Sequence, residues 1–330
     1  MSLTIRRIDP FTQADQIKRL FLEHERPEFP EWFDRAYPLA MRAGGSTWVS
    51  LDGNDRVVAH MSTFRAAFWL GDEVVHGALL CNLMVDKAHR TFFPVVALFK
   101  QVVKDLRSDG AEFIYSNPIN AGAIAVVRAA GLAKVGDHYR YLLPVGHRRL
   151  FLHAATGAYL ACRRLLNRGY SAKRVPTQEA ADWTIGVHTR ISSVTAKRYP
   201  ELYFMRYGNQ DGPDTIGFAV YGPDGRQVGA SVMRVNLEGD GNGDVITLRC
   251  LAMEHVPGIA AALGSAARHA GVRRVNLTVL AGTPYAAALV RGGFIQRTEP
   301  WSVVGVGCTD RGRAVIAGLA FSDLEKIDVD

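Results

Sequence analysis

The chain contains little of what marks the specialised classes of protein. Its four cysteines, Cys81, Cys162, Cys250 and Cys308, lie far apart, which argues against a disulfide framework and against a zinc site. No low-complexity segment is present, and no apolar run is long enough to span a membrane. Residues 1–10 also lack the apolar core of a signal peptide. These absences predict an ordinary globular protein in the cytoplasm.

What is present is a large apolar content together with an excess of positive charge. Hydrophobic residues make up 48% of the 330 residues, enough to bury a large core, and this length favours two domains. The net charge of +7 and the pI near 9.3 imply an anionic partner: a nucleotide, coenzyme A (CoA), an acidic carrier protein, lipid headgroups or nucleic acid. A specific nucleic-acid motif is not indicated, because the basic residues are not interleaved with aromatic ones.

A strand, a helix, a second strand and a second helix are predicted in the first half. The apolar run Leu79–Val85 predicts a buried strand, and apolar residues recur at helical spacing over 94–107. Residues 111–116 predict another strand, followed by a turn at Asn117-Pro118. A small-residue helix then runs over 120–130. This order predicts a mixed α/β fold.

These residues resemble the core of the GNAT acyl-CoA N-acyltransferases. That family has a strand ending in an apolar residue and Val, a basic residue in the next turn, and a helix built on Asn and Ala that ends in Gly. Here the matching residues are Leu83-Met84-Val85, Arg90, Asn117–Asn120 and Ala129-Ala130-Gly131-Leu132.

The resemblance implies that an acyl-CoA thioester lies along the strands that end at Val85 and Ser116. Backbone amides at a strand end and at a helix N-terminus can polarise the thioester carbonyl and hold the diphosphate. We therefore expect few specific side chains in contact with the cofactor. The residues implied in binding acyl-CoA are Leu83, Met84, Val85, Arg90, Thr91, Phe92, Phe93, Asn117 and Asn120.

The sequence also departs from the family pattern. Phe93 and Val95 occupy turn positions where the family has small residues, and Pro94 removes one amide donor. Many relatives use a Tyr as the acid that protonates the leaving thiolate, and Val127 stands at that position here. A GNAT-like fold whose cofactor slot is altered or lost is therefore an open alternative.

Other candidate site residues lie before this core. His60 and His76 are candidates for the base that deprotonates the amine, and Asn82 is a polar residue in an apolar strand near the expected carbonyl. The acidic and aromatic segment around Glu25, Glu28, Glu31 and Trp32 is a candidate for binding an amine or a sugar. For each of them a purely structural role is the alternative.

The second half repeats the pattern of the first. The corresponding segments are 79–85 and 245–253, 94–107 and 259–270, 111–116 and 274–280, and Gly131-Leu132 and Gly293-Phe294. An internal repeat of this kind predicts tandem GNAT-like domains over 1–146 and 181–330. The second copy lacks the basic residue and the glycines at its turn, and Leu289 stands at its Tyr position, so we expect it to have lost the cofactor site.

The segment 147–180 differs from both halves, since it combines many Arg and Lys residues with leucines. It predicts a basic amphipathic linker helix. Three roles fit: bridging the domains, docking an anionic substrate or an acyl carrier protein, and lying on a membrane. We favour the bridging role, because such a helix has to bury its apolar face against a domain in any case, and we expect no membrane contact.

The tandem arrangement resembles that of bacterial nucleotide-sugar and polysaccharide-pathway N-acyltransferases. The similar stretches are Leu202–Tyr207, Trp301 and the acidic tail Phe321–Asp328. The resemblance implies transfer of an acyl group from acetyl-CoA or another acyl-CoA to a small amine such as an amino sugar or a nucleotide-linked amino sugar. Two alternatives stay open: a donor that is an acyl carrier protein or aminoacyl-tRNA, and a non-catalytic scaffold. No metal is implied.

Overall fold

The first four strands form an antiparallel meander. The computed structural model describes residues 3–119, 121–146, 150–187, 193–197, 199–200, 215–236 and 239–319. The meander consists of β1 (Thr4–Ile8), β2 (Ser46–Leu51), β3 (Val57–Leu70) and β4 (Glu73–Val85). Asp52 fixes the turn between β2 and β3, because its Oδ1 accepts hydrogen bonds from the amides of Asn54 and Arg56.

The central unit of the first half follows the predicted order. Strand β5 (Phe113–Ile119) lies parallel to β4, and β6 (Ala133–Pro144) follows later in the chain. The predicted turn at Asn117-Pro118 is wrong, because both residues continue β5. Proline is tolerated there because the pairing of β5 with β4 ends at Ser116. The helices of this half are η1 (Pro10–Gln13), α1 (Ala14–Leu22), α2 (Phe29–Arg42), η2 (Lys87–His89), α3 (Phe92–Ser108) and α4 (Ala121–Ala129).

The second half repeats this order and adds a C-terminal helix. Its strands are β7 (Ser171–Val175), β8 (Val194–Ala196), β9 (Thr215–Tyr221), β10 (Gln227–Val235), β11 (Asn242–Cys250), β12 (Arg274–Leu280) and β13 (Ile295–Gly307). Its helices are α5 (Leu150–Leu166), α6 (Thr177–Gly186), η3 (Met253–His255), α8 (Val256–His269), α9 (Pro284–Arg291) and α10 (Asp310–Gly318). The stretches Leu202–Tyr207 and Phe321–Asp328 lie outside the described residues.

The predicted linker helix is shorter than its sequence pattern suggested. Helix α5 ends at Leu166, and residues 171–175 form the edge strand β7, which pairs with β9. The helix stops because Gly169 adopts a φ of 88°, a left-handed conformation that breaks the helical pattern. The basic residues Lys173 and Arg174 therefore belong to a strand at the sheet edge.

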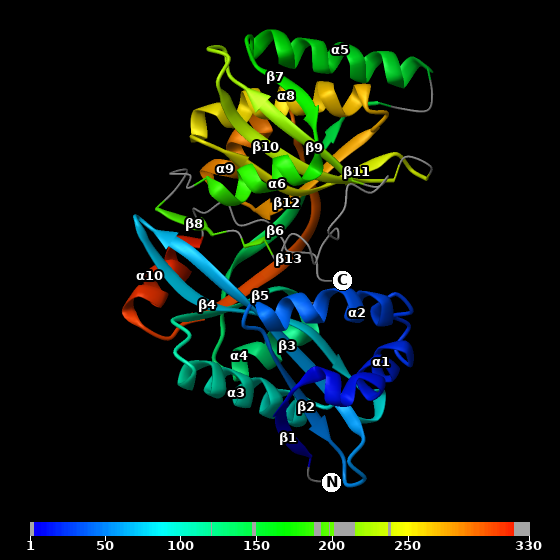
Figure 1. Cartoon of the computed structure of the whole chain (residues 1–330), viewed down its shortest axis with the longest axis vertical. Coiled ribbons are helices and arrows are strands. Elements are labelled where there is room, and N and C mark those ends of the chain that lie inside the picture. Colours follow the sequence, from blue (N-terminus) through cyan, green and yellow to red (C-terminus); the bar gives the residue numbers. More distant parts are fainter. Residues whose placement is uncertain are drawn as a thin grey trace.

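The strands of the described residues join one thirteen-stranded mixed sheet in which the two halves exchange a strand (Figure 1). Strand β13 lies between β5 and β6, and β6 in turn lies between β13 and β12. Each half thus inserts its last strand beside the other half's parallel pair, β4–β5 or β11–β12. The mixed α/β fold with a repeated order of elements is confirmed.

The buried side chains follow this exchange. Tyr141, Leu143 and Val145, which follow the first-half helices in sequence, lie in the core of the second half with Leu263. Conversely, Val315 of α10 packs in the first-half core. The boundary predicted at residue 146 therefore describes the repeat in the sequence, while β6 packs in both cores and β13 packs in the first-half core.

Helix α10 is fixed to the first half through Glu112, whose carbonyl oxygen accepts from the amides of Cys308 (2.7 Å) and Thr309 (3.3 Å). A Cβ at Gly312 would clash with this carbonyl. We expect Gly312→Ala to lower the free energy of unfolding by roughly 1–3 kcal/mol, as overpacking does, in denaturant titrations. Gly186→Ala is the control, since its Cβ would meet open space; equal stability of the two variants would contradict the tight contact.

Candidate active site

Strand β4 is interrupted by a bulge at Asn82. The pairing of β4 with β3 shifts register between His60 and Ser62, so that Asn82 and Leu83 lie opposite Met61. Asn82 has a φ of 52°, in the left-handed region that asparagine tolerates better than most residues with a side chain. A bulge bends its strand and redirects the backbone that follows.

The bulge lies where β4 and β5 part. Their last paired residues are Leu80 and Ser116, and both strands continue beyond this pair. Exposure changes at the same point, because residues 78–80 are buried whereas residues 81–84 are half-buried. Backbone amides that a parallel ladder would use therefore line the space between the two strand ends.

A ring of hydrogen bonds holds the bulge, and we call Tyr37, His60, Ser62 and Asn82 the bulge cluster. The Asn82 side-chain amide donates to Ser62 Oγ at 3.1 Å, and Ser62 Oγ lies 3.3 Å from the Tyr37 hydroxyl. The Tyr37 hydroxyl lies 3.0 Å from His60 Nε2, and His60 Nδ1 lies 2.8 Å from the Asn82 carbonyl oxygen. Because a carbonyl only accepts, we assign the proton to Nδ1 and let Nε2 accept from Tyr37.

The bulge cluster is neutral, and its members Tyr37, His60 and Ser62 are buried. His60 has no exposed surface, and its ring lies 5.5 Å from that of Phe21 and 6.4 Å from that of Phe29. Burial lowers the pKa of His60 to about 4, against the opposing effect of its bond to the Asn82 carbonyl. Burial also raises the pKa of Tyr37 well above its ordinary value, and that of the adjacent Cys81 thiol to about 12. At neutral pH the ring of hydrogen bonds therefore carries no charge.

Helix α3 begins shortly after the end of β4, with only the short helix η2 between them. Its N-cap residue Thr91 makes no side-chain capping bond, so the amides of the first turn stay available, except at Pro94, which has none. Arg90 folds back onto the strand, with Nε donating to the Val85 carbonyl at 3.0 Å. Phe93 projects into solvent with 81% of its surface exposed. The site offers an anion backbone donors and one guanidinium.

Asn117 places an unsatisfied amide on β5, one residue beyond the last pair with β4. Its Oδ1 and Nδ2 are both buried and have no hydrogen-bond partner in the described part of the chain. A buried amide without partners is costly, and such groups often mark a place where a ligand binds. Donor and acceptor together match the amide groups of a pantetheine chain.

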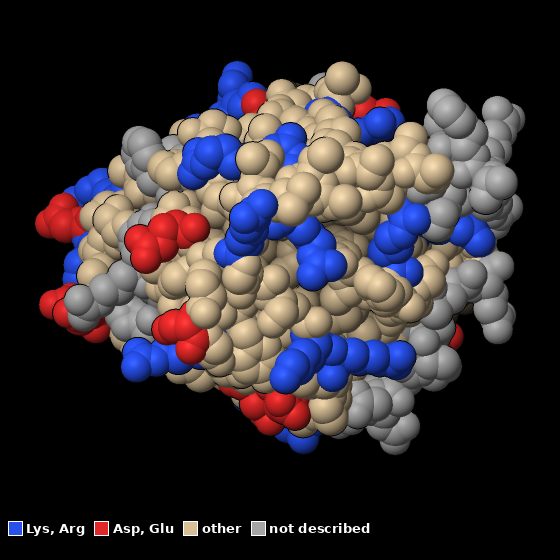
Figure 2. Space-filling model, turned by 90° about the horizontal axis from the view of Figure 1, so that it is seen from above, with Lys and Arg blue, Asp and Glu red and all other residues tan. Residues whose placement is uncertain are grey.

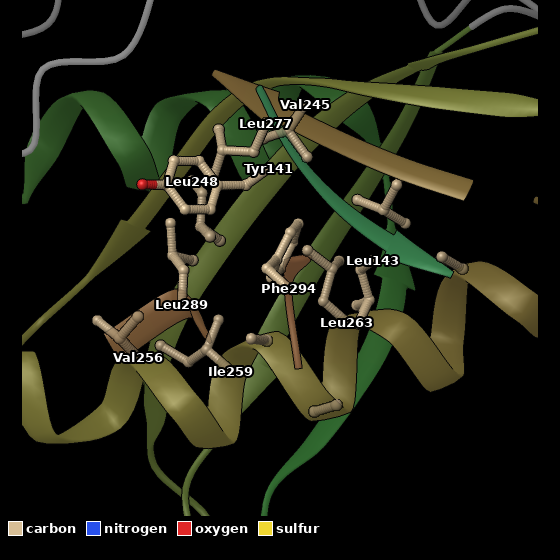
Figure 3. Close-up of a cluster of buried hydrophobic side chains, with 14 of the residues drawn as sticks. Tyr141, Leu143, Val245, Leu248, Val256, Ile259, Leu263, Leu277, Leu289 and Phe294 are labelled. Atoms are coloured by element: carbon tan, nitrogen blue, oxygen red, sulfur yellow. The ribbon is translucent and has the colours of Figure 1, made fainter. Parts of the chain in front are cut away.

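The equivalent region of the second half is filled. Strands β11 and β12 also part, after Asp244 and Asn276, yet residues 245–250 are all buried. The Tyr285 ring is 1% exposed, and its hydroxyl lies 3.5 Å from the Leu248 carbonyl oxygen. Figure 3 shows the labelled side chains of this core packed between the strands and helix α8.

The structure brings only part of the predicted site together. Asn82, His60 and the strand end Leu83–Val85 lie around the bulge, and Arg90 and the first turn of α3 lie next to them. His76 lies six residues earlier on β4, roughly 20 Å along a strand, where its Nδ1 is 3.2 Å from Arg65. Asn120 lies outside the described residues.

The predicted acceptor segment meets the bulge cluster through one aromatic ring. The Trp32 ring is half-buried on α2 and meets the Tyr37 ring edge-on at 5.6 Å. Glu25 and Glu28 are exposed, and Glu28 lies 3.7 Å from Arg26. The Trp32 side chain is thus close to the bulge cluster, while both carboxylates face solvent.

Two members of the bulge cluster, Tyr37 and Ser62, were missed by the sequence analysis. Tyr37 lies on α2, where Pro38 inside the helix masks the helical pattern. Ser62 lies in a strand where a serine carries no signal of its own. Within the described residues, no group of three or more His, Cys, Asp or Glu side chains could hold a metal ion. No described helix is both long enough and apolar enough to cross a bilayer.

No protein-family model and no curated protein match the sequence, but solved structures match the fold. A probable N-acyltransferase from Enterococcus faecalis V583 has a TM-score of 0.65 and 11% identity, over 93% of this chain and 73% of that one. The GCN5-related glucosamine N-acetyltransferase region of a fungal multi-domain β-N-acetylglucosaminidase has a TM-score of 0.60 and 12% identity, over 92% of this chain and 38% of that one.

A third solved structure has an acyl-CoA bound. Saccharomyces cerevisiae N-myristoyltransferase with bound myristoyl-CoA has a TM-score of 0.55 and 11% identity, over 92% of this chain and 78% of that one. At such low identities the likeness concerns the fold. The chain has the fold of the GCN5-related N-acyltransferases, as the residues around Leu83–Val85 predicted.

Proposed function

We propose that the protein is an N-acyltransferase that takes an acyl group from acyl-CoA and transfers it to a small amine. The observation that carries the proposal is the unsatisfied Asn117 amide beside the parted ends of β4 and β5. Solved relatives of the fold support it, since one binds myristoyl-CoA and another is named a glucosamine N-acetyltransferase.

The donor would lie between the two strand ends. The side-chain amide of Asn117 would hydrogen-bond to the pantetheine chain, and the free backbone amides of Phe92 and Phe93, together with Arg90, would face the diphosphate. This assignment compensates for the missing glycines, because the helix N-terminus supplies donors without them. The exposed Phe93 ring leaves the turn accessible to a nucleotide.

The chemistry requires polarisation of the thioester carbonyl. The backbone amide at Leu83, within the bulge of β4, would donate to the carbonyl oxygen as it becomes an oxyanion. The neutral amine attacks, a C–N bond forms, the C–S bond breaks, and the amine proton passes to solvent. CoA leaves as a thiolate, because Val127 is fully buried where relatives have a tyrosine.

We propose that His60 positions the bulge instead of taking a proton from the amine. Both ring nitrogens already make hydrogen bonds within the bulge cluster, and the side chain has no exposed surface. Asn82 acts in the same way, since its side chain donates to Ser62. His76 lies six residues before Asn82 on β4 and stays a candidate base only if the acceptor reaches that end of the strand.

For the acceptor we propose an amino sugar, free or nucleotide-linked, bound on the α2 side of the bulge. The half-buried Trp32 ring offers a stacking surface for a sugar, and Glu25 and Glu28 offer carboxylates to an ammonium group. The second copy would act as a scaffold, because Tyr285 fills its slot. We also infer a cytoplasmic location, which the four free cysteines support.

The proposal is tested by thiol release from acetyl-CoA in the presence of a panel of amino sugars and other small amines. We expect release that depends on the acceptor. Activity only with an acylated carrier protein or an aminoacyl-tRNA would replace the donor, and complete inactivity with every donor and acceptor would favour a non-catalytic scaffold.

Asn117→Ala should weaken CoA binding without destabilising the free protein. The substitution removes two hydrogen bonds to the ligand, worth about a tenfold loss of affinity or more, but it removes no hydrogen bond from the free protein. Calorimetry with CoA and thermal unfolding measure the two effects. Asn54→Ala, at an exposed turn, is the matched control. An unchanged dissociation constant would reject the pantetheine contact.

Lowering the pH should destabilise the protein through His60. Its folded-state pKa near 4 lies below the usual 6.5, so protons bind the unfolded chain first and stability falls as the pH drops from 6.5 toward 4. Between pH 6.5 and pH 5 this amounts to about 2 kcal/mol. In denaturant unfolding, the free energy of unfolding of His60→Gln should lack this part of the pH dependence. The variant His269→Gln, at an exposed position, should keep it. Parallel pH profiles for all three proteins would refute the assignment.

A further inference from the structure

Helix α5 is held on the second half by one of its faces. The Tyr159 hydroxyl donates to the Gly293 carbonyl at 2.6 Å, and Leu160 is 3% exposed in the second-half core. Arg163 donates to the Arg291 carbonyl at 3.2 Å, and Arg268 lies 3.4 Å from the Thr156 hydroxyl. These contacts fix which face of the helix points outward.

The outward face of α5 is apolar, which reverses the usual pattern of a surface helix. Leu165 and Leu166 are 60% and 76% exposed, and Arg164 is the one polar residue among the exposed positions from 154 to 166. We call these exposed apolar residues the outer face of α5: Ala154, Ala155, Ala158, Ala161, Cys162, Leu165 and Leu166. Contiguous apolar surface of this kind marks a site of interaction.

The outer face is bordered by positive charge. No Asp or Glu occurs between Asp137 and Glu179, and Arg164, Arg168 and Lys173 are exposed at or just beyond the C-terminal end of the helix. Figure 2 views the molecule from the α5 end: Lys and Arg side chains lie across its centre, while most acidic side chains lie toward the left and lower margins. This charge pattern complements an anionic surface.

The position of α5 suits a flat partner. The helix lies across one end of the long axis of the molecule, so the side of the helix opposite the second half faces away from the rest of the protein (Figure 1). An acidic carrier protein would be recognised mainly by cations, but the exposed positions of α5 from 154 to 166 are all apolar except Arg164. A bilayer surface accepts that arrangement, with leucines among the acyl chains and guanidinium groups at the headgroups.

We propose that the outer face of α5 binds the surface of a membrane that contains anionic lipids, with the helix lying in the plane of the interface. The bridging role favoured by the sequence does not account for a helix whose apolar residues face solvent. The contact is peripheral, since α5 spans only residues 150–166 and carries arginines. The proposal concerns a surface separate from the bulge and does not depend on acyl transfer.

The test is co-sedimentation of the full chain with vesicles, without CoA. We expect binding to phosphatidylserine and phosphatidylcholine vesicles at low salt, weaker binding at high salt, and little binding to phosphatidylcholine alone. Leu165→Ser with Leu166→Ser should lower the partition coefficient by about tenfold or more. Leu22→Ser, which changes an exposed leucine of α1, should bind like the unaltered chain.

The outcomes that overturn the proposal are distinct. The first is failure of the unaltered chain to bind anionic vesicles. The second is equal binding by the unaltered chain and the double leucine variant, which would show that the interaction is an unspecific attraction between charges. Sedimentation equilibrium tests whether a second copy of the chain binds the outer face instead. A dimer that the leucine substitutions dissociate would show that it does. Circular dichroism of the double variant establishes that it is folded, as expected for exposed positions.

Discussion

The site depends on one backbone conformation, the left-handed Asn82 in the middle of β4. Without the bulge, β4 and β5 would continue as a parallel ladder, and every amide between them would be used within the sheet. A left-handed residue with a side chain is unfavourable, so it persists only where its surroundings restrain it. Here Ser62 binds the side chain of Asn82 and His60 binds its carbonyl, and Tyr37 joins these two partners.

This restraint requires a neutral histidine in an apolar pocket. The Phe21 and Phe29 rings, stacked 3.4 Å apart, contribute the pocket from α1 and α2. Their packing therefore determines the protonation state of His60, and His60 determines how Asn82 is held. The helices before the central unit thus act on the strand end through a short series of contacts, although they contribute few groups that a substrate could reach.

The two halves show that the same order of elements can yield an open or a closed strand end. In the first half, the end of β5 carries Asn117 with an unsatisfied amide. In the second half, Asn276 donates to Asp244 at 2.8 Å, and Tyr285 packs over the strands that part beyond this pair. The exchange of β6 and β13 joins the two cores. The second half, whose strand end is filled, therefore stabilises the strands beside the open strand end of the first half.

Much of the fold followed from the sequence because its signals are local. The apolar run Leu79–Val85, the helical spacing over 94–107 and the glycines that end the helices each depend on near neighbours, and their repetition after residue 245 revealed the second copy. The strand end at Leu83–Val85 was singled out by resemblance, since the proposed cofactor site is built mainly from backbone. Asn82 stood out because a polar residue in an apolar strand needs partners.

The tertiary structure decided what depends on residues far apart in the chain. The sequence could not predict that Tyr37, Ser62 and His60 enclose Asn82, because no local pattern links a helix residue to two positions on a later strand. The sequence predicted the amphipathic pattern of α5 but not which face would be buried. That depends on contacts with Arg291, the last residue of α9, and with Gly293 just beyond it. Periodicity alone determined where helices and strands form, whereas long-range packing determined which polar groups meet and which apolar face remains exposed.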